Sequence, residues 1–367
     1  MDPISQGAIG ALVSQVASRR EKLRAFAVLG CIAGMAPDLD VFIDSSTDPL
    51  LFLEFHRQFT HALLFIPIGA ALVALPLQPV VRRTLRPRET YLACLLGYAT
   101  HGLLDACTSY GTQLLWPFSE HRVAWNNVSV VDPLFTLPLL GLVSLAAVRR
   151  RRAFAVAGLF WAVCYLALGA VQHQRAEEAG AQLAAERGHQ PRRLFAKAGF
   201  ANLLVWKVVY EHGGRFHVDA IRAGMDVTVC PGASIARLDL RSDFPWLEPG
   251  SRQARDVERF RRFSDGYVAI DPRRPNRIID MRYSMVPNTI DPLWGIDLDP
   301  RAPPDRHVRY VEDRASHPDP HRMYWRLLTG EDCRARLDTR TGSVASRVIS
   351  QRISRFGPDR ARPDLSH

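Results

Sequence analysis

The chain has 367 residues, 47% of them hydrophobic, and a formal net charge of +10. This length allows two domains. The apolar runs all lie before about residue 171, whereas the remainder is polar and rich in proline and arginine, which excludes a uniformly soluble protein. Much of the charge lies in short arginine blocks beside apolar segments, so we do not expect nucleic-acid binding. The first residues contain no short apolar run followed by a small-residue cleavage site, so we expect no removable signal peptide.

The N-terminal half is predicted to be a polytopic helical membrane domain. Residues 4–16 form a weakly apolar helix, with Asp2 as its N-cap and Pro3 at its first position, and Asp132 and Pro133 begin a later helix in the same way. A spanning helix needs about 20 mostly apolar residues. Four later segments approach this length: 61–80, 91–110, 130–148 and 153–171. A fifth, 25–43, is apolar until the sequence PDLD, and either spans or enters one leaflet. We therefore predict about five spans.

The distribution of basic residues predicts the orientation of these helices, because short cytoplasmic loops are rich in arginine and lysine. Three loops are basic, at residues 19–24, 82–88 and 149–152, whereas 44–60 and 111–129 carry only Arg57 and Arg122. If all five segments span, basic and non-basic loops alternate. The N-terminus is then cytoplasmic, and everything after residue 171 is extracytoplasmic.

The C-terminal half reads as a small α+β or β-rich soluble domain. A polar helix at 173–187 precedes a hairpin of strands 203–210 and 215–221, with His-Gly-Gly as the turn. Further short strands are expected at 267–270 and 277–283. The predicted domains are 1–172 (membrane), 173–351 (soluble) and 352–367, a disordered basic tail.

Six cysteines are present without a CxxC pair. Four are assigned to membrane segments, and the other two, Cys230 and Cys333, fall in the soluble half. In an oxidising compartment these two are candidates for a disulfide.

Ionisable side chains within membrane segments are costly and indicate function. Asp38 and Asp40 end the segment at 25–43, His56 and His61 precede the next, and His101 and Asp105 lie one turn apart on one helix face. The orientation derived from the basic loops places all six residues at the extracytoplasmic side.

These residue types suit a divalent metal, with Zn²⁺ favoured and Mn²⁺ or Fe²⁺ as alternatives. Asp38, His61, His101 and Asp105 are the predicted ligands. Asp40 and His56 are expected to orient a ligand or to act as general base, and Arg57 to bind an anionic substrate oxygen. Singly, each has a structural alternative, such as a helix cap, a loop residue or a buried His–Asp pair. His121, His173 and His212 lack clustered partners and read as surface residues.

Several motifs together resemble those of the LexA-regulated, inner-membrane-bound, metal-dependent hydrolases (YdjM-like). They are MDPISQGA (1–8), PDLD (37–40), HRQFTH (56–61), HGLLD (101–105), TSYGT (108–112), WPFS (116–119) and SVVDPLF (129–135). The resemblance covers roughly residues 1–171, with a weaker match at 202–210. Family members often have histidine where this chain has Gln6, so the resemblance gives no N-terminal ligand here.

By resemblance, the protein is a hydrolase in the bacterial inner membrane, and the orientation derived from the basic loops then makes its C-terminal domain periplasmic. The family is related by proposal to zinc-dependent phospholipase C and P1-type nucleases, which implies a phosphoester or lipid-like substrate. The alternatives are a transporter whose intramembrane histidine and aspartate move ions, and a scaffold or binding module anchored by the membrane half. The sequence specifies neither the substrate nor the oligomeric state.

Overall fold

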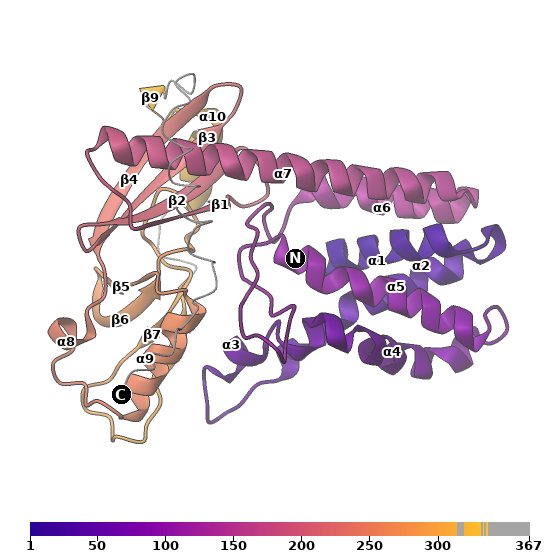
Figure 1. Ribbon diagram of the computed structural model, residues 1–367, viewed down its shortest axis with the longest axis horizontal. Helices are drawn as coiled ribbons and strands as arrows, with labels where there is room; N and C mark the ends of the chain where they lie inside the picture. Colours follow the sequence, from indigo (N-terminus) through magenta and orange to yellow (C-terminus); the bar gives the residue numbers. More distant parts are fainter. Residues whose placement is uncertain (314–318, 332, 334, 337–367) are drawn as a thin grey trace, which may run out of the picture.

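The computed structural model describes residues 1–313, 319–331, 333, 335 and 336, so the predicted tail at 352–367 lies outside the described residues. The N-terminal part is helical, and two antiparallel sheets follow it (Figure 1). Helix α7 (Arg152–Glu186) joins the two parts: its first half lies beside α6 (Pro133–Arg149), and its second half crosses the first sheet, along the top of Figure 1.

The other helices of the N-terminal part are α1 (Pro3–Ala17), α2 (Leu23–Met35), α3 (Leu51–Phe55), α4 (Ile66–Val81) and α5 (Pro87–Ala106). Two 3₁₀ turns, η2 (Ala36–Phe42) and η3 (Phe59–His61), continue or precede them. The predicted N-caps are confirmed: the carboxylates of Asp2 and Asp132 accept hydrogen bonds from the amides of Ser5 (3.0 Å) and Leu134 (3.1 Å). A proline follows each cap. It is tolerated there because an amide N–H in the first turn of a helix has no acceptor within the helix, so its absence costs no hydrogen bond.

Three helical stretches among the described residues are long and apolar enough to cross a membrane: Arg20–Phe42, Leu63–Val81 and Arg152–Glu186. Five spans are therefore not confirmed. Helix α6 is apolar but has only 17 residues, because Asp132 fixes its start. Helix α5, which covers the span predicted at 91–110, begins at Pro87 and ends at Ala106. It does not reach the hydropathy of the other three, since it carries Arg88, Glu89, His101 and Asp105 within its length.

Two helix boundaries differ from the predictions for local reasons. The span predicted from residue 61 starts at Leu63, because His61 belongs to η3. The separate helix predicted at 173–187 is the second half of α7, which runs without a break from Arg152 to Glu186. No glycine or proline lies between Val171 and Arg175 to interrupt it.

The basic loops meet at one end of the helical part. Lys22 forms an ion pair with Glu89 at the start of α5 (2.6 Å), and Arg20 lines a surface hollow together with Arg150, Arg151 and Arg152. The N-terminus lies at the opposite end of α1, where the α-amino group of Met1 contacts Asp105. The prediction that the N-terminus shares a side with the basic loops is therefore wrong, because α1 itself runs the length between them.

Glycines allow α2 to approach α1 and α5 closely. A Cβ atom added to Gly97 of α5 would lie 2.3 Å from the carbonyl oxygen of Gly30 in α2, and one added to Gly30 would lie 2.4 Å from the carbonyl oxygen of Gly10 in α1. Small residues at such crossings let helix backbones pack together within a bilayer. The contact fixes α5, which carries His101 and Asp105, against the helix that leads to Asp38.

The C-terminal part contains two antiparallel sheets. The first has the order β1-β2-β3-β4-β9 and the second the order β5-β6-β7-β8. Their strands are β1 (Arg193–Ala198), β2 (Val205–His212), β3 (Arg215–Ala223), β4 (Val227–Ala236), β5 (Val268–Asp271), β6 (Arg274–Asp280), β7 (Trp294–Asp297), β8 (Arg309–Glu312) and β9 (Ala335–Arg336). Helices α8 (Leu240–Asp243), α9 (Arg252–Phe263) and α10 (Pro320–Thr329) connect or flank them.

The predicted hairpin is confirmed as β2–β3, which pairs His212 with Arg215 across Gly213 and Gly214. The strands predicted at 267–270 and 277–283 correspond to β5 and β6, and β6 already ends at Asp280. One face of β2 packs Trp206 and Val208 against α7. The alternate residues of β2 face the opposite way, toward the segment at 284–289.

A short loop element of the membrane region docks on the C-terminal part. Leu50 and Leu53, at and within α3, share a core with residues of α9, and in Figure 1 α3 lies on the side of the helical part that faces α9. Arg259 of α9 forms ion pairs with Asp48 (2.9 Å) and Glu54 (2.6 Å). The C-terminal part therefore supports the loop that carries His56 and Arg57.

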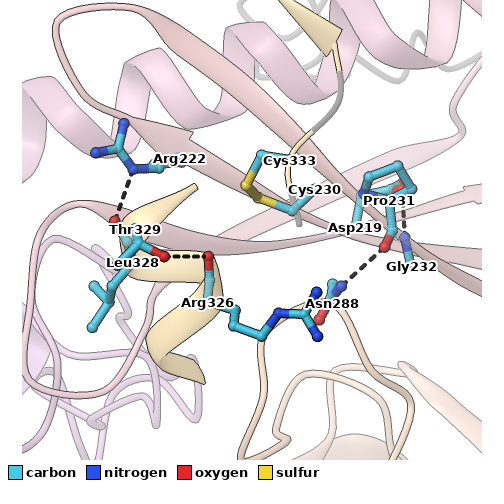
Figure 2. Close-up of a disulfide and its surroundings, with 10 residues drawn as sticks. All are labelled: Asp219, Arg222, Cys230, Pro231, Gly232, Asn288, Arg326, Leu328, Thr329 and Cys333. Carbon is cyan, nitrogen blue, oxygen red and sulfur yellow. Dashed lines mark hydrogen bonds between the residues drawn. A yellow bond between two sulfur atoms is a disulfide. The ribbon is translucent and has the colours of Figure 1, made fainter. Parts of the chain in front are cut away.

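Cys230 of β4 and Cys333 form a disulfide, which confirms the predicted pairing (Figure 2). Figure 2 also shows two contacts beside it: Asn288 donates to the carbonyl oxygen of Pro231 (2.9 Å), and Arg222 donates to that of Leu328 (2.9 Å). The bond closes a loop of 103 residues in sequence separation. It ties the segment that follows α10 to the first sheet.

Replacing Cys333 with serine should destabilise the C-terminal part, because loss of this cross-link enlarges the conformational freedom of the unfolded chain. For a loop of this length the chain-entropy model gives about 4 kcal/mol. Thermal unfolding of Cys333→Ser beside Cys164→Ser, which removes an exposed free thiol, measures the difference. Equal midpoints, or full labelling of Cys230 and Cys333 by a thiol reagent in the unreduced wild type, would contradict the prediction.

Candidate metal centre

Four predicted ligands come together from three separate segments. Asp38 lies in η2 directly after α2, His61 ends η3, and His101 and Asp105 lie one turn apart near the end of α5. One ligand atom from each of the four residues lies within 4.8 Å of the others. His61, His101 and Asp105 are buried, and Asp38 is partly exposed.

The spacing of these atoms suits one small cation. The Nε2 atoms of His61 and His101 are 2.9 Å apart. An Asp38 oxygen lies 3.3 Å from the Nε2 of His101 and 3.6 Å from that of His61, and Asp105 Oδ2 lies at 3.6 and 3.1 Å from the same two atoms. Four tetrahedral ligands with bonds near 2 Å to zinc are separated by about 3.3 Å. The observed distances therefore bracket the value for a tetrahedral ion.

The opposite ring nitrogens fix the orientation of both histidines. His101 Nδ1 lies 2.5 Å from the carbonyl oxygen of Gly34, which can only accept a hydrogen bond. His61 Nδ1 lies 2.9 Å from Thr60 Oγ1 and 3.3 Å from the carboxylate of Asp40. With the proton on Nδ1, each neutral ring presents a lone pair on Nε2. The two lone pairs then face and repel each other, and a cation bound between them would replace this repulsion by attraction.

Asp40 is committed to supporting the loop rather than to the four-residue cluster. It is 3% exposed, and it accepts hydrogen bonds from the amide of Arg57 (3.0 Å) and the hydroxyl of Thr60 (2.8 Å). Its other oxygen lies 2.7 Å from His56 Nδ1. The carboxylate thereby orients His56, whose side chain is partly exposed beside the cluster.

Arg57 is buried against the ligand set. Its Nε lies 3.1 Å from Asp105 Oδ2, and its terminal nitrogen donates to Thr108 (2.9 Å). Asp105 Oδ2 and Arg57 Nε form no regular hydrogen bond. The backbone of Arg57 has a φ of 62°, a left-handed conformation that costs a non-glycine residue about 1–3 kcal/mol. The guanidinium is thus held at the cluster against local backbone preference.

Two residues, Gln6 and Arg122, have supporting roles that were not predicted from the sequence. Gln6 donates to Asp105 Oδ1 (3.0 Å) and therefore supports one of the predicted ligands. Arg122 donates to the carbonyl oxygens of Leu53 (2.7 Å) and His56 (3.1 Å), which holds the loop in place. The sequence contains one indication of this role, because Arg122 is the only arginine or lysine in the loop at 111–129. Of the three histidines predicted to be surface residues, His121 is exposed. His173 and His212 are partly buried beside or within the first sheet.

Comparisons with known proteins match the same region. Residues 1–176 match the model of the YdjM inner membrane protein family. The chain is also similar to the uncharacterized protein YfhP of Bacillus subtilis (strain 168), with 24% identity over 146 residues, which are 39% of this chain and 43% of that protein. The chain therefore covers less than half the length of this relative.

No solved structure matches the chain, so the distant resemblance to zinc-dependent phospholipase C and P1-type nucleases stays a prediction from motifs. The family match, by contrast, spans α1 to the middle of α7 and includes every residue of the cluster. This agrees with the YdjM-like resemblance of the sequence motifs. Residues 1–176, which contain the candidate metal centre, therefore match the YdjM inner membrane protein family.

Proposed function

We propose that this chain is an integral-membrane, metal-dependent hydrolase of a phosphoester or lipid-like substrate. The observation that carries the proposal is the spacing of Asp38, His61, His101 and Asp105, whose ligand atoms lie within 4.8 Å of one another. Two imidazoles and two carboxylates favour Zn²⁺, with Mn²⁺ or Fe²⁺ as alternatives. The cluster's position beside apolar helices suits a substrate that approaches from the lipid bilayer.

A bound divalent ion would supply Lewis acidity, lowering the pKa of a water molecule and polarising the ester. The protein's own groups would do the rest. His56, oriented by Asp40 through Nδ1, would take a proton from the attacking water through its other ring nitrogen. Arg57 would bind an anionic substrate oxygen and stabilise the charge that develops on it.

Hydrolysis assays on the purified protein in detergent test this proposal. The protein is stripped with a chelator, reloaded with Zn²⁺, Mn²⁺ or Fe²⁺, and offered phosphomonoesters, phosphodiesters and phospholipids. We expect activity that depends on the added ion and is reduced in Arg57→Ala. Ion flux in proteoliposomes with no hydrolysis of any substrate would instead favour a transporter.

We also propose that the C-terminal part is periplasmic and that the three basic loops are cytoplasmic. The proposal rests on the convergence of the basic loops at the end of the helices opposite to the metal cluster. Alkaline phosphatase fused after the exposed Gly188, at the end of α7, should be active, and the same reporter fused after the exposed Thr84 should be inactive. Activity of the Thr84 fusion, or silence of the Gly188 fusion, would contradict this orientation.

A further inference from the structure

Two lysines face each other in the first sheet, and neither forms an ion pair with a carboxylate of the described residues, although Asp280 attracts both electrostatically. Lys197 of β1 and Lys207 of β2 are paired across the strands, so their side chains lie on the same face. Lys207 is 1% exposed, and its ammonium group donates to Ser284 Oγ (2.9 Å) and the carbonyl oxygen of Thr289 (2.8 Å). Burial lowers the pKa of Lys197 to about 8 and that of Lys207 to about 7. A buried and a partly exposed lysine side by side, with no ion pair to a carboxylate of the described residues, are an unfavourable arrangement that a bound anion would offset.

Tyr283 lies next to Lys197 and Trp294 lies next to Tyr283, and the polar hydrogens of both rings lack acceptors among the described residues. Its ammonium group is 4.8 Å from the centre of the Tyr283 ring. The hydroxyl of Tyr283 is buried without a hydrogen-bond partner, and the whole residue is 6% exposed. Trp294, whose ring centre is 4.5 Å from that of Tyr283, has a buried indole N–H that also lacks an acceptor. Burial raises the pKa of Tyr283, so its hydroxyl stays protonated and remains a donor.

A continuous run of ring and guanidinium contacts connects this cluster to the candidate metal centre. The Arg57 guanidinium lies 4.9 Å from the centre of the Tyr110 ring, which is 5.1 Å from that of Phe263. The Arg282 guanidinium lies 5.6 Å from the centre of the Phe263 ring and 5.3 Å from the centre of the Tyr283 ring. Tyr283 also interacts electrostatically with Arg57 and Tyr110. The donors of the C-terminal part therefore lie toward the side of the metal cluster that Arg57 covers.

We propose that Lys197, Tyr283 and Trp294 form an anion subsite, through which the C-terminal part binds a phosphoryl group of the substrate beside the metal centre. The subsite deepens the proposed hydrolase function and rests on it for the identity of the substrate. Among the described residues, the Tyr283 hydroxyl and the Trp294 indole N–H are buried donors without acceptors, as an oxyanion requires, and Lys197 supplies positive charge. Arg282 is a positioning residue, because its guanidinium is already paired with Asp280 (2.7 Å).

The subsite residues lie outside residues 1–176, so the family match does not include them. A purely structural reading treats the cations and rings as interface packing. That reading predicts that substitutions lower thermal stability without changing the affinity for an anion. The subsite instead predicts that substitutions lower the affinity for an anion and leave thermal stability nearly unchanged. Tyr283→Phe tests this best, because it removes one hydroxyl and keeps the ring contacts.

The test uses inorganic phosphate as the probe and the full chain in nanodiscs of phosphatidylcholine. Calorimetry measures phosphate affinity in the absence of metal, and Mn²⁺ is then added, so that broadening of the phosphate ³¹P resonance reports its proximity to the bound ion. We expect Lys197→Met and Tyr283→Phe each to weaken phosphate binding roughly tenfold, with Mn²⁺ affinity unchanged. Tyr267→Phe is the matched control, since Tyr267 is a buried tyrosine under Arg193 (3.9 Å) in the same part of the chain.

The outcomes separate the subsite from the hydrolase proposal. Phosphate binding that the two variants weaken, but without Mn²⁺ binding, would support the subsite and overturn the metal centre. Phosphate affinity that is absent in the wild type, or equal in the wild type and both variants, would overturn the subsite even if Mn²⁺ binds. Adding phosphatidic acid to the nanodiscs identifies the source of the phosphoryl group: competition with phosphate indicates a lipid headgroup, and no competition indicates a soluble phosphoester.

Discussion

Replacing His101 with alanine should abolish metal binding while the protein still inserts into the membrane. His101 contributes an Nε2 atom 2.9 Å from that of His61 and 3.3 Å from Asp38, so its removal leaves three ligands and an open position in a buried site. Elemental analysis of detergent-purified protein after reloading with Zn²⁺ measures the effect. We expect about one ion per wild-type chain and close to none in the variant.

Two further variants make this test quantitative. Asp40→Asn alters a residue that orients His56 and contacts His61, and loss of such support typically weakens metal affinity 10- to 100-fold. His121→Ala changes an exposed histidine outside the cluster and should bind metal as the wild type does. Full metal content in His101→Ala, or equal loss in His121→Ala, would show that the ion binds elsewhere.

Replacing Gly97 with alanine should destabilise the helical part and impair the metal centre together. The added Cβ would lie 2.3 Å from the carbonyl oxygen of Gly30 and 2.8 Å from its Cα. These are backbone atoms that cannot rotate away, so α5 must move away from α2. Overpacking of this kind typically costs about 1–3 kcal/mol. Because α5 carries His101 and Asp105 and α2 leads to Asp38, metal affinity should fall as well.

Gly141→Ala is the matched control, since it makes the same change in α6, where an added Cβ meets nothing within 4 Å. It should leave the thermal midpoint unchanged or slightly raised, because alanine favours helix more than glycine does. Midpoints and bound metal are measured in the same detergent for both variants. If Gly97→Ala behaved like Gly141→Ala, the close approach of α2 and α5 would not be what positions the ligands.

The sequence predicted the ligand set because ionisable residues are conspicuous among apolar ones. Asp38, His61, His101 and Asp105 each interrupt or border an apolar segment, and their residue types suit the same class of metal. The helical spacing of His101 and Asp105 indicated one face. The structure brings the four candidate ligand atoms within 4.8 Å of one another.

The span count could not be read as reliably, because length and composition decide it only when polar residues are few. Helix α5 contains polar residues, among them Thr90, His101 and Asp105, that are buried inside the helical part. Their presence lowers its mean hydropathy below that of a typical span. Helix α1 was predicted to be weakly apolar, and most of it, including residues 5–12, is buried against its neighbours. A hydropathy window does not distinguish a helix sheltered by other helices from one that lies outside the bilayer.

The sequence by itself determined the order of the two parts, the helix starts at Asp2 and Asp132, the β2–β3 turn and the chemistry of the candidate ligands, because each depends on residues close together in the chain. Tertiary structure decided the rest: the docking of α3 on α9, the support of His56 by Asp40 and Arg122, and the meeting of Lys197, Tyr283 and Trp294. These contacts join segments tens to hundreds of residues apart, and their partners follow from how whole helices and sheets pack rather than from any local pattern.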